Sequence, residues 1–139
     1  MRLAGPGRVV LIAGAICAAV SACGKSQRAL ENRQWSDTFA FRITVDPTPP
    51  RAIEDAVYKI VVQDKKTGEP IQTGQGRIFA NAKDGTGTND GLEKGKEVGT
   101  YYARLRYPIG GDWAVGLQFR RDSTSRLERV DWIQFVKSE

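Results

Sequence analysis

The chain has 139 residues and a formal net charge of +5, which is room for one domain with a modest core. It contains no histidine, its one methionine is Met1, and its two cysteines, Cys17 and Cys23, lie near the N-terminus. The sequence after residue 23 therefore has no imidazole, thioether or thiol. This excludes histidine-dependent catalytic triads, zinc fingers, blue-copper centres, haem held by such side chains, and a disulfide within the domain.

The N-terminal segment, residues 1–22, has the pattern of an export signal. Arg2 and Arg8 form a basic beginning, and an apolar run follows over residues 9–20. The run is too short to cross a bilayer core, which needs about 20 residues. Small residues follow it, as at a secretory cleavage site.

The tetrad that ends this segment is aliphatic, small, alanine and cysteine: Val20-Ser21-Ala22-Cys23. It resembles the lipobox of bacterial lipoproteins. The resemblance implies that the Cys23 thiol receives a diacylglyceryl group, that the leader is cut before it, and that the new amine is usually acylated. Stable anchoring needs two or more acyl chains. An ordinary signal peptide is the alternative, but it would leave an unpaired thiol in an oxidising compartment.

The expected location is the cell envelope, with the membrane as a partner through the acyl chains on Cys23. Gly24 follows the cysteine where an aspartate would resemble the inner-membrane retention signal. The outer membrane, facing the periplasm, is therefore favoured in a cell with two membranes. Removal of the leader takes away two arginines and no acid, so the net charge falls from +5 to +3. The mild charge and the exported destination argue against nucleic acid as a partner.

A polar segment, residues 23–38, is predicted to be a lipidated tether, and residues 39–139 are predicted to form the domain. A short helix over residues 27–32 is an alternative within the tether. Trp35 is either the first residue docked on the domain or an interfacial anchor, and docking is favoured.

From residue 39 the apolar residues alternate with polar ones, which is typical of strands with one buried face. The predicted strands are residues 39–46, 56–63, 70–73, 76–82, 100–107, 112–120 and 128–136. The expected inward residues are Phe39, Phe41, Ile43, Val45, Tyr58, Ile60, Val62, Ile78, Ala80, Ala82, Tyr101, Ala103, Leu105, Tyr107, Trp113, Val115, Leu117 and Phe119. Val57 and Val61 indicate that the second strand is covered on both sides. The last strand contributes Val130, Trp132, Ile133, Phe135 and Val136.

The two central strands are predicted to form a hairpin through the loop 108–112. Inward residues must face inward residues, so the numbers of paired residues have an even sum. A sum of 220 pairs Tyr107 with Trp113 and Tyr101 with Phe119, and it gives a loop of common length. The outward face would then carry Tyr102, Arg104 and Arg106 beside Gln118 and Arg120.

Short strands with turn residues between them predict an all-β fold, a single immunoglobulin-like antiparallel β-sandwich of six or seven strands. Several turn and strand motifs agree with this: the proline-rich segment 47–50, Gly68-Glu69-Pro70-Ile71, Gly99-Thr100-Tyr101-Tyr102 and Gly110-Gly111-Asp112-Trp113. Their order resembles the YtkA-like and FixH-like β-sandwich domains of exported bacterial proteins, over about residues 39–136.

That resemblance, together with the related CopC-type sandwiches, implies copper handling or oxidase assembly through methionine and histidine ligands. This sequence has neither residue after the leader, so the copper role does not carry over. Carboxylates alone are poor ligands for Cu(I), which prefers soft donors. No cofactor is expected.

Two constellations are candidate binding sites. The glycine-rich segment 83–97 is predicted to be a long exposed loop. Its Asp84, Asp90 and Glu93 offer oxygen ligands for calcium, but the spacing is not that of an EF-hand and lysines crowd the loop. The outward stripe of Tyr102, Arg104, Arg106 and Arg120, with Arg121, Arg126 and Arg129 nearby, is a candidate face for anions, lipid headgroups or an acidic partner protein. An ordinary solvated surface is the simpler interpretation of both.

Catalysis is not expected, because no serine has a nucleophile-elbow context and a small sandwich leaves little room for a substrate cleft. The sequence therefore predicts a membrane-anchored exported lipoprotein whose sandwich is a non-catalytic binding or assembly module with an envelope protein partner. The alternatives are a carrier of small molecules or ions, related to copper-handling sandwiches, and a structural envelope protein.

Overall fold

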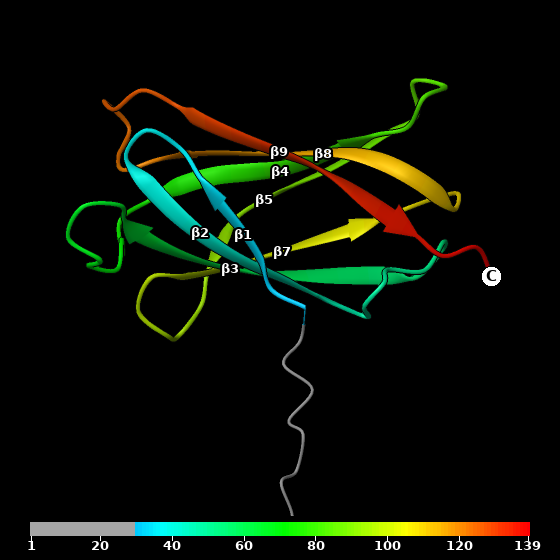
Figure 1. Ribbon diagram of the computed structural model, residues 1–139, viewed down its shortest axis with the longest axis horizontal. Coiled ribbons are helices and arrows are strands. Elements are labelled where there is room, and N and C mark those ends of the chain that lie inside the picture. The colour runs from blue at the N-terminus through cyan, green and yellow to red at the C-terminus, as the bar shows by residue number, and fades with distance from the viewer. Residues whose placement is uncertain (1–29) are drawn as a thin grey trace, which may run out of the picture.

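The computed structural model describes residues 30–139, which form two antiparallel β-sheets packed face to face (Figure 1). The five-stranded sheet has the order β1 (Asn32–Trp35), β2 (Phe39–Asp46), β3 (Asp55–Asp64), β7 (Thr100–Arg106) and β6 (Glu93–Lys94). The four-stranded sheet has the order β5 (Gly87–Gly91), β4 (Gln75–Asn81), β8 (Gly111–Arg120) and β9 (Glu128–Val136). In this part of the chain no helix is long and apolar enough to cross a bilayer.

The strand order is that of an immunoglobulin-like sandwich. Strands β2, β3, β7 and β6 follow the order A, B, E, D of an immunoglobulin constant domain, and β4, β8 and β9 follow the order C, F, G. Strands β1 and β5 add one edge to each sheet. The predicted fold is confirmed, but the described residues form nine strands, and the prediction of six or seven is too low.

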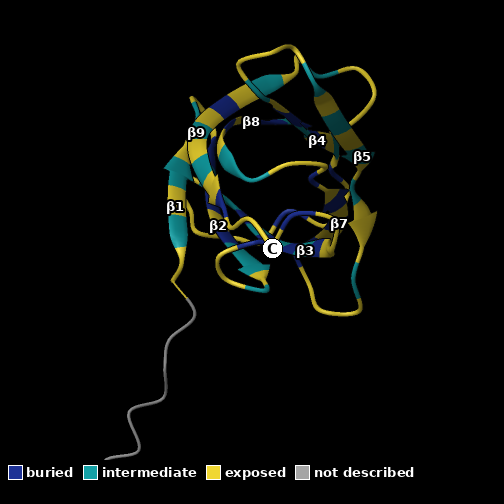
Figure 2. Cartoon of the chain, turned by 90° about the vertical axis from the view of Figure 1, so that its right-hand side faces the viewer, coloured by how far each residue is buried: buried dark blue, intermediate teal, exposed yellow. Residues whose placement is uncertain are grey.

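The core lies between the sheets and consists mainly of the alternating residues predicted to face inward (Figure 2). It also contains Ala52, Ala56 and Ile71, whereas the predicted inward residues Val45, Ala82 and Trp132 are only partly buried. Trp113, Tyr58 and Tyr101 are among its largest fully buried side chains. The hydroxyl groups of Tyr58 and Tyr107 lie 2.5 Å apart and share one hydrogen bond. Val57 and Val61, on the outer side of β3, are only half-buried. In β9 the alternation turns Ile133 and Phe135 outward, where they are 68% and 55% exposed.

The predicted hairpin between residues 100–107 and 112–120 is wrong, because the two strands belong to different sheets. Strand β7 pairs with β3 and β6, whereas β8 pairs with β4 and β9. Two of the predicted pairs nevertheless meet, as aromatic contacts across the core. The ring centroids of Tyr107 and Trp113 are 5.1 Å apart, and those of Tyr101 and Phe119 are 5.3 Å apart. Inward residues face other inward residues both across a hairpin and across the core between two sheets. The alternation of the sequence therefore fits either arrangement.

The predicted tether, residues 23–38, contains part of the domain. Strand β1 pairs with β2, with Asn32 opposite Ile43 and Trp35 opposite Ala40. The alternative of a short helix over residues 27–32 is contradicted at Asn32, which lies in β1, and residues 27–29 lie outside the described part. The favoured docking of Trp35 is also wrong, since its side chain points to the outer side of the sheet and is 58% exposed. An edge strand forms here through backbone pairing, without an apolar face.

The predicted loop 83–97 contains two short strands. Strand β5 pairs with β4 to form a hairpin, and β6 pairs with β7 at Tyr102 and Tyr101. The Asp90 carboxylate accepts a hydrogen bond from the backbone N–H of Arg104 at 2.8 Å, which joins the two sheets at this edge. Residues 70–73, predicted as a weak strand, form only a bridge between Gln63 and Pro70.

Candidate functional site

The residues predicted to form a binding face do not lie on one surface. Tyr102, Arg104 and Arg106 point outward from β7 in the five-stranded sheet, whereas Arg120 lies on β8 in the four-stranded sheet. The predicted stripe depended on the hairpin, so it is wrong for the same reason. Arg104 lies 3.9 Å from the carboxylate of Asp55, and Arg120 donates hydrogen bonds to the side-chain amide of Gln75. The proposed lipidation residue, Cys23, lies outside the described residues.

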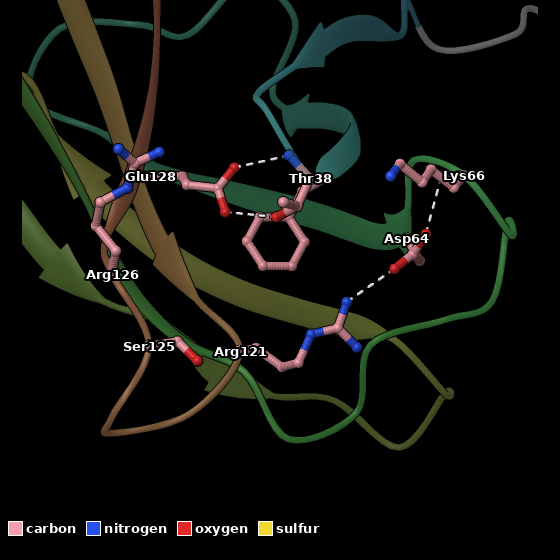
Figure 3. Close-up of a pocket in the computed structure, with 8 residues that line it drawn as sticks. Thr38, Asp64, Lys66, Arg121, Ser125, Arg126 and Glu128 are labelled. Carbon is pink, nitrogen blue, oxygen red and sulfur yellow. Dashed lines mark hydrogen bonds and ion pairs between the residues drawn. The ribbon is translucent and has the colours of Figure 1, made fainter.

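Arg121 and Arg126, two of the arginines expected near that stripe, lie instead with Lys66 at one end of the sandwich, where β2 and β9 begin and β3 and β8 end (Figure 3). Here the structure has an open cavity of about 420 Å³, which we call the end hollow. This volume is within the range of about 300–1,000 Å³ that is typical of ligand sites. The hollow is lined by Thr38, Phe39, Asp64, Lys66, Arg121, Ser125, Arg126 and Glu128.

One wall of the end hollow is built around Arg121 and Asp64, whose Nη2 and Oδ2 atoms are 2.8 Å apart (Figure 3). The Asp64 carboxylate also accepts hydrogen bonds from the backbone N–H groups of Thr67 and Lys66. These backbone bonds, together with Arg121, lower the pKa of Asp64. The Arg121 guanidinium lies 5.8 Å from the ring centroid of Phe39, a cation–π distance. Asp64 therefore fixes both the turn that carries Lys66 and the position of Arg121.

The other wall is the loop between β8 and β9, which Asp122 holds in a tight turn. Its Oδ1 accepts hydrogen bonds from the backbone N–H and hydroxyl groups of both Thr124 and Ser125, at 2.7–3.0 Å. These bonds, those of Thr124 first, lower the pKa of Asp122 to about 2. The turn places Arg121 at its start and Arg126 at its end. Arg126 pairs with Asp37 at 2.8 Å, and because both side chains are more than three-quarters exposed, this pair contributes little to stability.

Glu128, at the start of β9, connects the two ends of the described chain. Its carboxylate accepts hydrogen bonds from the Ser36 hydroxyl at 2.8 Å and from the backbone N–H and hydroxyl of Thr38 at 2.8 and 2.5 Å. Burial raises the pKa of Glu128, but the hydrogen bonds from Thr38 and Ser36 outweigh it, and the net pKa is lowered. The carboxylate is therefore ionised at neutral pH, and its oxygens accept hydrogen bonds from the turn between β1 and β2.

The arrangement favours binding of anions over acid–base chemistry. Both carboxylates that line the end hollow have a lowered pKa, whereas a general acid needs a raised one. Their oxygens accept hydrogen bonds from the protein, which leaves Lys66, Arg121 and Arg126 as the charged groups with free donors. Across residues 30–139 no group of three or more carboxylate, histidine or cysteine side chains is placed to hold a metal ion, the segment 84–93 included.

Sequence reasoning named Arg121 and Arg126 as candidates but missed Lys66 and the hollow itself, because the residues come from turns that are distant in the chain. Two local signals were present. Asp64 and Asp122 each precede hydroxyl residues or glycine within a few positions, which is typical of a turn in which an aspartate accepts backbone N–H bonds. Neither signal shows that the two turns meet, because only the strand topology brings the ends of β3 and β8 together.

Comparison with known proteins supports the fold alone. No family model matches the sequence, and no curated protein matches it. Among solved structures, the chain is similar to a DUF4426 family protein from Pseudomonas aeruginosa PAO1, with a TM-score of 0.60 at 12% identity. The match covers 78% of this chain and 96% of that protein. The resemblance to YtkA-like and FixH-like domains stays a prediction.

Proposed function

We propose that the protein is a lipid-anchored exported protein of the cell envelope whose β-sandwich is a non-catalytic binding module. In this proposal Cys23 carries the acyl chains, and the end hollow binds an acidic group of an envelope partner. The lipobox tetrad supports the anchor. The convergence of Lys66, Arg121 and Arg126 on one open cavity is the observation that carries the binding role.

The donors of the end hollow match the acceptors of a carboxylate or phosphate. Arg121 makes one ion pair, to Asp64, and Arg126 makes one, to Asp37, so each guanidinium keeps further N–H donors. Lys66 makes no ion pair within residues 30–139. Charge-assisted bonds of this kind are stronger than neutral hydrogen bonds. The hydroxyl group of Ser125 also lines the cavity, but its proton is donated to Asp122.

The first half of the experiment tests the anchor. The full chain and a Cys23→Ala variant are expressed in a two-membrane bacterium and supplied with a clickable fatty acid. We expect label and detergent partitioning for the unmodified chain and neither for the variant. A Cys23→Ala protein that remains labelled and membrane-bound would contradict the anchor.

The second half tests the end hollow. A photo-crosslinking amino acid is placed at Ser125, in the hollow, and as a control at Ala114, on the exposed outer side of β8. We expect an envelope protein to be captured from Ser125 and not from Ala114. The capture should weaken in high salt and in a Lys66→Gln, Arg126→Gln variant. Equal capture at both positions, or capture that these two changes leave intact, would contradict the proposed site and favour the carrier or structural alternative.

A further inference from the structure

The outer side of β1 exposes an aromatic side chain, and β1 begins nine positions after Cys23 in the sequence. Trp35 is 58% exposed, and Leu30, the first described residue, is 80% exposed. Trp35 is the one tryptophan among the exposed large apolar side chains of residues 30–139. Because β1 is the edge of the five-stranded sheet, no neighbouring strand covers Trp35 from that side.

The side chains around Trp35 carry excess positive charge. Arg33 and Arg42 lie opposite each other on β1 and β2, and both point outward. They share one carboxylate, Glu31, at 3.1 and 3.9 Å respectively. The Lys65 ammonium group donates to the backbone oxygen of Ser36 and is held next to the end of β1. We call the set Arg33, Trp35, Arg42 and Lys65 the β1 patch; three cations face one acid there.

We infer that the β1 patch lies against the phospholipid headgroups of the membrane that holds the acyl anchor. The inference rests on the proposed anchor at Cys23. Tryptophan is enriched at membrane–water interfaces, where its ring is partly dehydrated and its N–H stays hydrated. Arginine and lysine near the surface are attracted to anionic headgroups.

The chain length between the anchor and the patch makes this contact feasible. Leu30 is seven positions after Cys23, so the described domain begins at most about 25 Å from the acylated residue. One tryptophan and three cations bind a membrane weakly on their own. Attachment through Cys23 keeps the patch at a high effective concentration beside the lipid, so a weak attraction is enough to orient the domain.

The opposite face of the sandwich provides a matched control. Phe135 on β9 is 55% exposed, which is close to the exposure of Trp35, but it lies on the outer side of the four-stranded sheet. Of the other two tryptophans, Trp113 is buried and Trp132 is half-buried. A variant that combines Trp35→Phe with Phe135→Trp therefore moves one exposed tryptophan from one face to the other and keeps the aromatic content constant.

The experiment uses the acylated full-length protein in vesicles of phosphatidylethanolamine and phosphatidylglycerol, with or without lipids brominated near the headgroup. Acylation at Cys23 is verified by mass spectrometry, and folding by an unchanged unfolding midpoint. Subtracting the signal of a Trp35→Phe variant isolates the exposed tryptophan. We expect its quenched fraction to fall at least about threefold in the swapped variant. We also expect quenching of Trp35 to decrease when salt is raised, because salt screens the cations.

Three results would overturn the inference. Equal quenching in both proteins, or stronger quenching in the swapped variant, would show that the β1 patch does not face the lipid. If the protein were acylated but Trp35 were not quenched, and if its emission shifted only after an envelope extract was added, the patch would be assigned to a protein partner. Absence of an acyl group on Cys23 would contradict the anchor itself, and this inference would fail with it.

Discussion

The hydroxyl group of Tyr101 holds the connection between β3 and β4, where the chain passes from one sheet to the other. It donates a hydrogen bond to the backbone oxygen of Ile71 at 2.6 Å and accepts one from the backbone N–H of Gly74 at 3.0 Å, both buried. Gly74 packs so closely on Phe119 that a Cβ atom would lie 1.9 Å from its ring. The loop therefore has no room to shift and find other partners.

Replacement of Tyr101 by phenylalanine should remove both bonds and leave the ring in place. A buried backbone group without a partner costs about 1–3 kcal/mol, so two such groups predict a loss of about 2–6 kcal/mol in the free energy of unfolding. At roughly 4 °C for each kcal/mol in a domain of this size, the Tm should fall by about 8–24 °C. Urea unfolding followed by tryptophan fluorescence measures the free energy, and calorimetry measures the Tm.

Tyr102→Phe is the matched control for this prediction. Tyr102 is the next residue on β7, points outward, and makes no hydrogen bond through its hydroxyl group within the described residues. It should unfold like the unmodified protein. If Tyr101→Phe changed the free energy of unfolding by less than about 0.5 kcal/mol, or only by as much as Tyr102→Phe, the conclusion that the Tyr101 hydroxyl holds this loop would be refuted.

Three further changes test the ends of the sandwich. Glu128→Gln should lower the free energy of unfolding by about 1–2 kcal/mol in urea, because it weakens the charge-assisted bonds to the β1–β2 turn; an unchanged midpoint would argue against this. The pKa of Asp122 is lowered to about 2 from its ordinary 3.8, so the carboxylate stabilises the folded state fully above pH 3.8, and this stabilisation is lost as the pH falls toward 2. In the Asp122→Asn variant the free energy of unfolding should therefore fall less steeply over this acid range. An equally steep fall would contradict the role given to Asp122. Ile53 has a positive φ of 70°, which is unfavourable for a β-branched residue, so Ile53→Asn should raise the free energy of unfolding by about 1 kcal/mol, and a decrease would show that its side-chain contacts outweigh the strain.

The core could be predicted from the sequence because period-two alternation is a local property. Each residue from Tyr101 to Tyr107 and from Trp113 to Phe119 that was expected to face inward is buried. Alternation shows which face of a strand is buried, but it does not identify the neighbouring strands. For that reason the contact between Tyr107 and Trp113 was predicted, whereas the sheet in which each lies was not.

Edge strands and end loops were predicted poorly because they form without apolar patterns. Gly87–Gly91 contains no large apolar residue, and it becomes a strand by pairing its backbone with β4. Trp35 was expected to dock, but its position in an edge strand, opposite Ala40, turns it outward. The end hollow depends on the meeting of two turns, at Asp64 and Asp122, that are remote in the sequence.

The end hollow, where we propose that an acidic group binds, also shows how a nearly balanced charge can leave mainly cationic donors on one surface. The carboxylates of Asp64, Asp122 and Glu128 accept backbone and hydroxyl hydrogen bonds that hold the turns around the hollow. Their acceptor capacity is thus used within the fold, whereas Lys66 and Arg126 keep donors toward solvent. A ligand would therefore encounter mainly cationic donors, although acids and bases alternate along the chain. Oxygen anions, rather than the soft metals that histidine and methionine would bind, are the ligands this set of side chains can select.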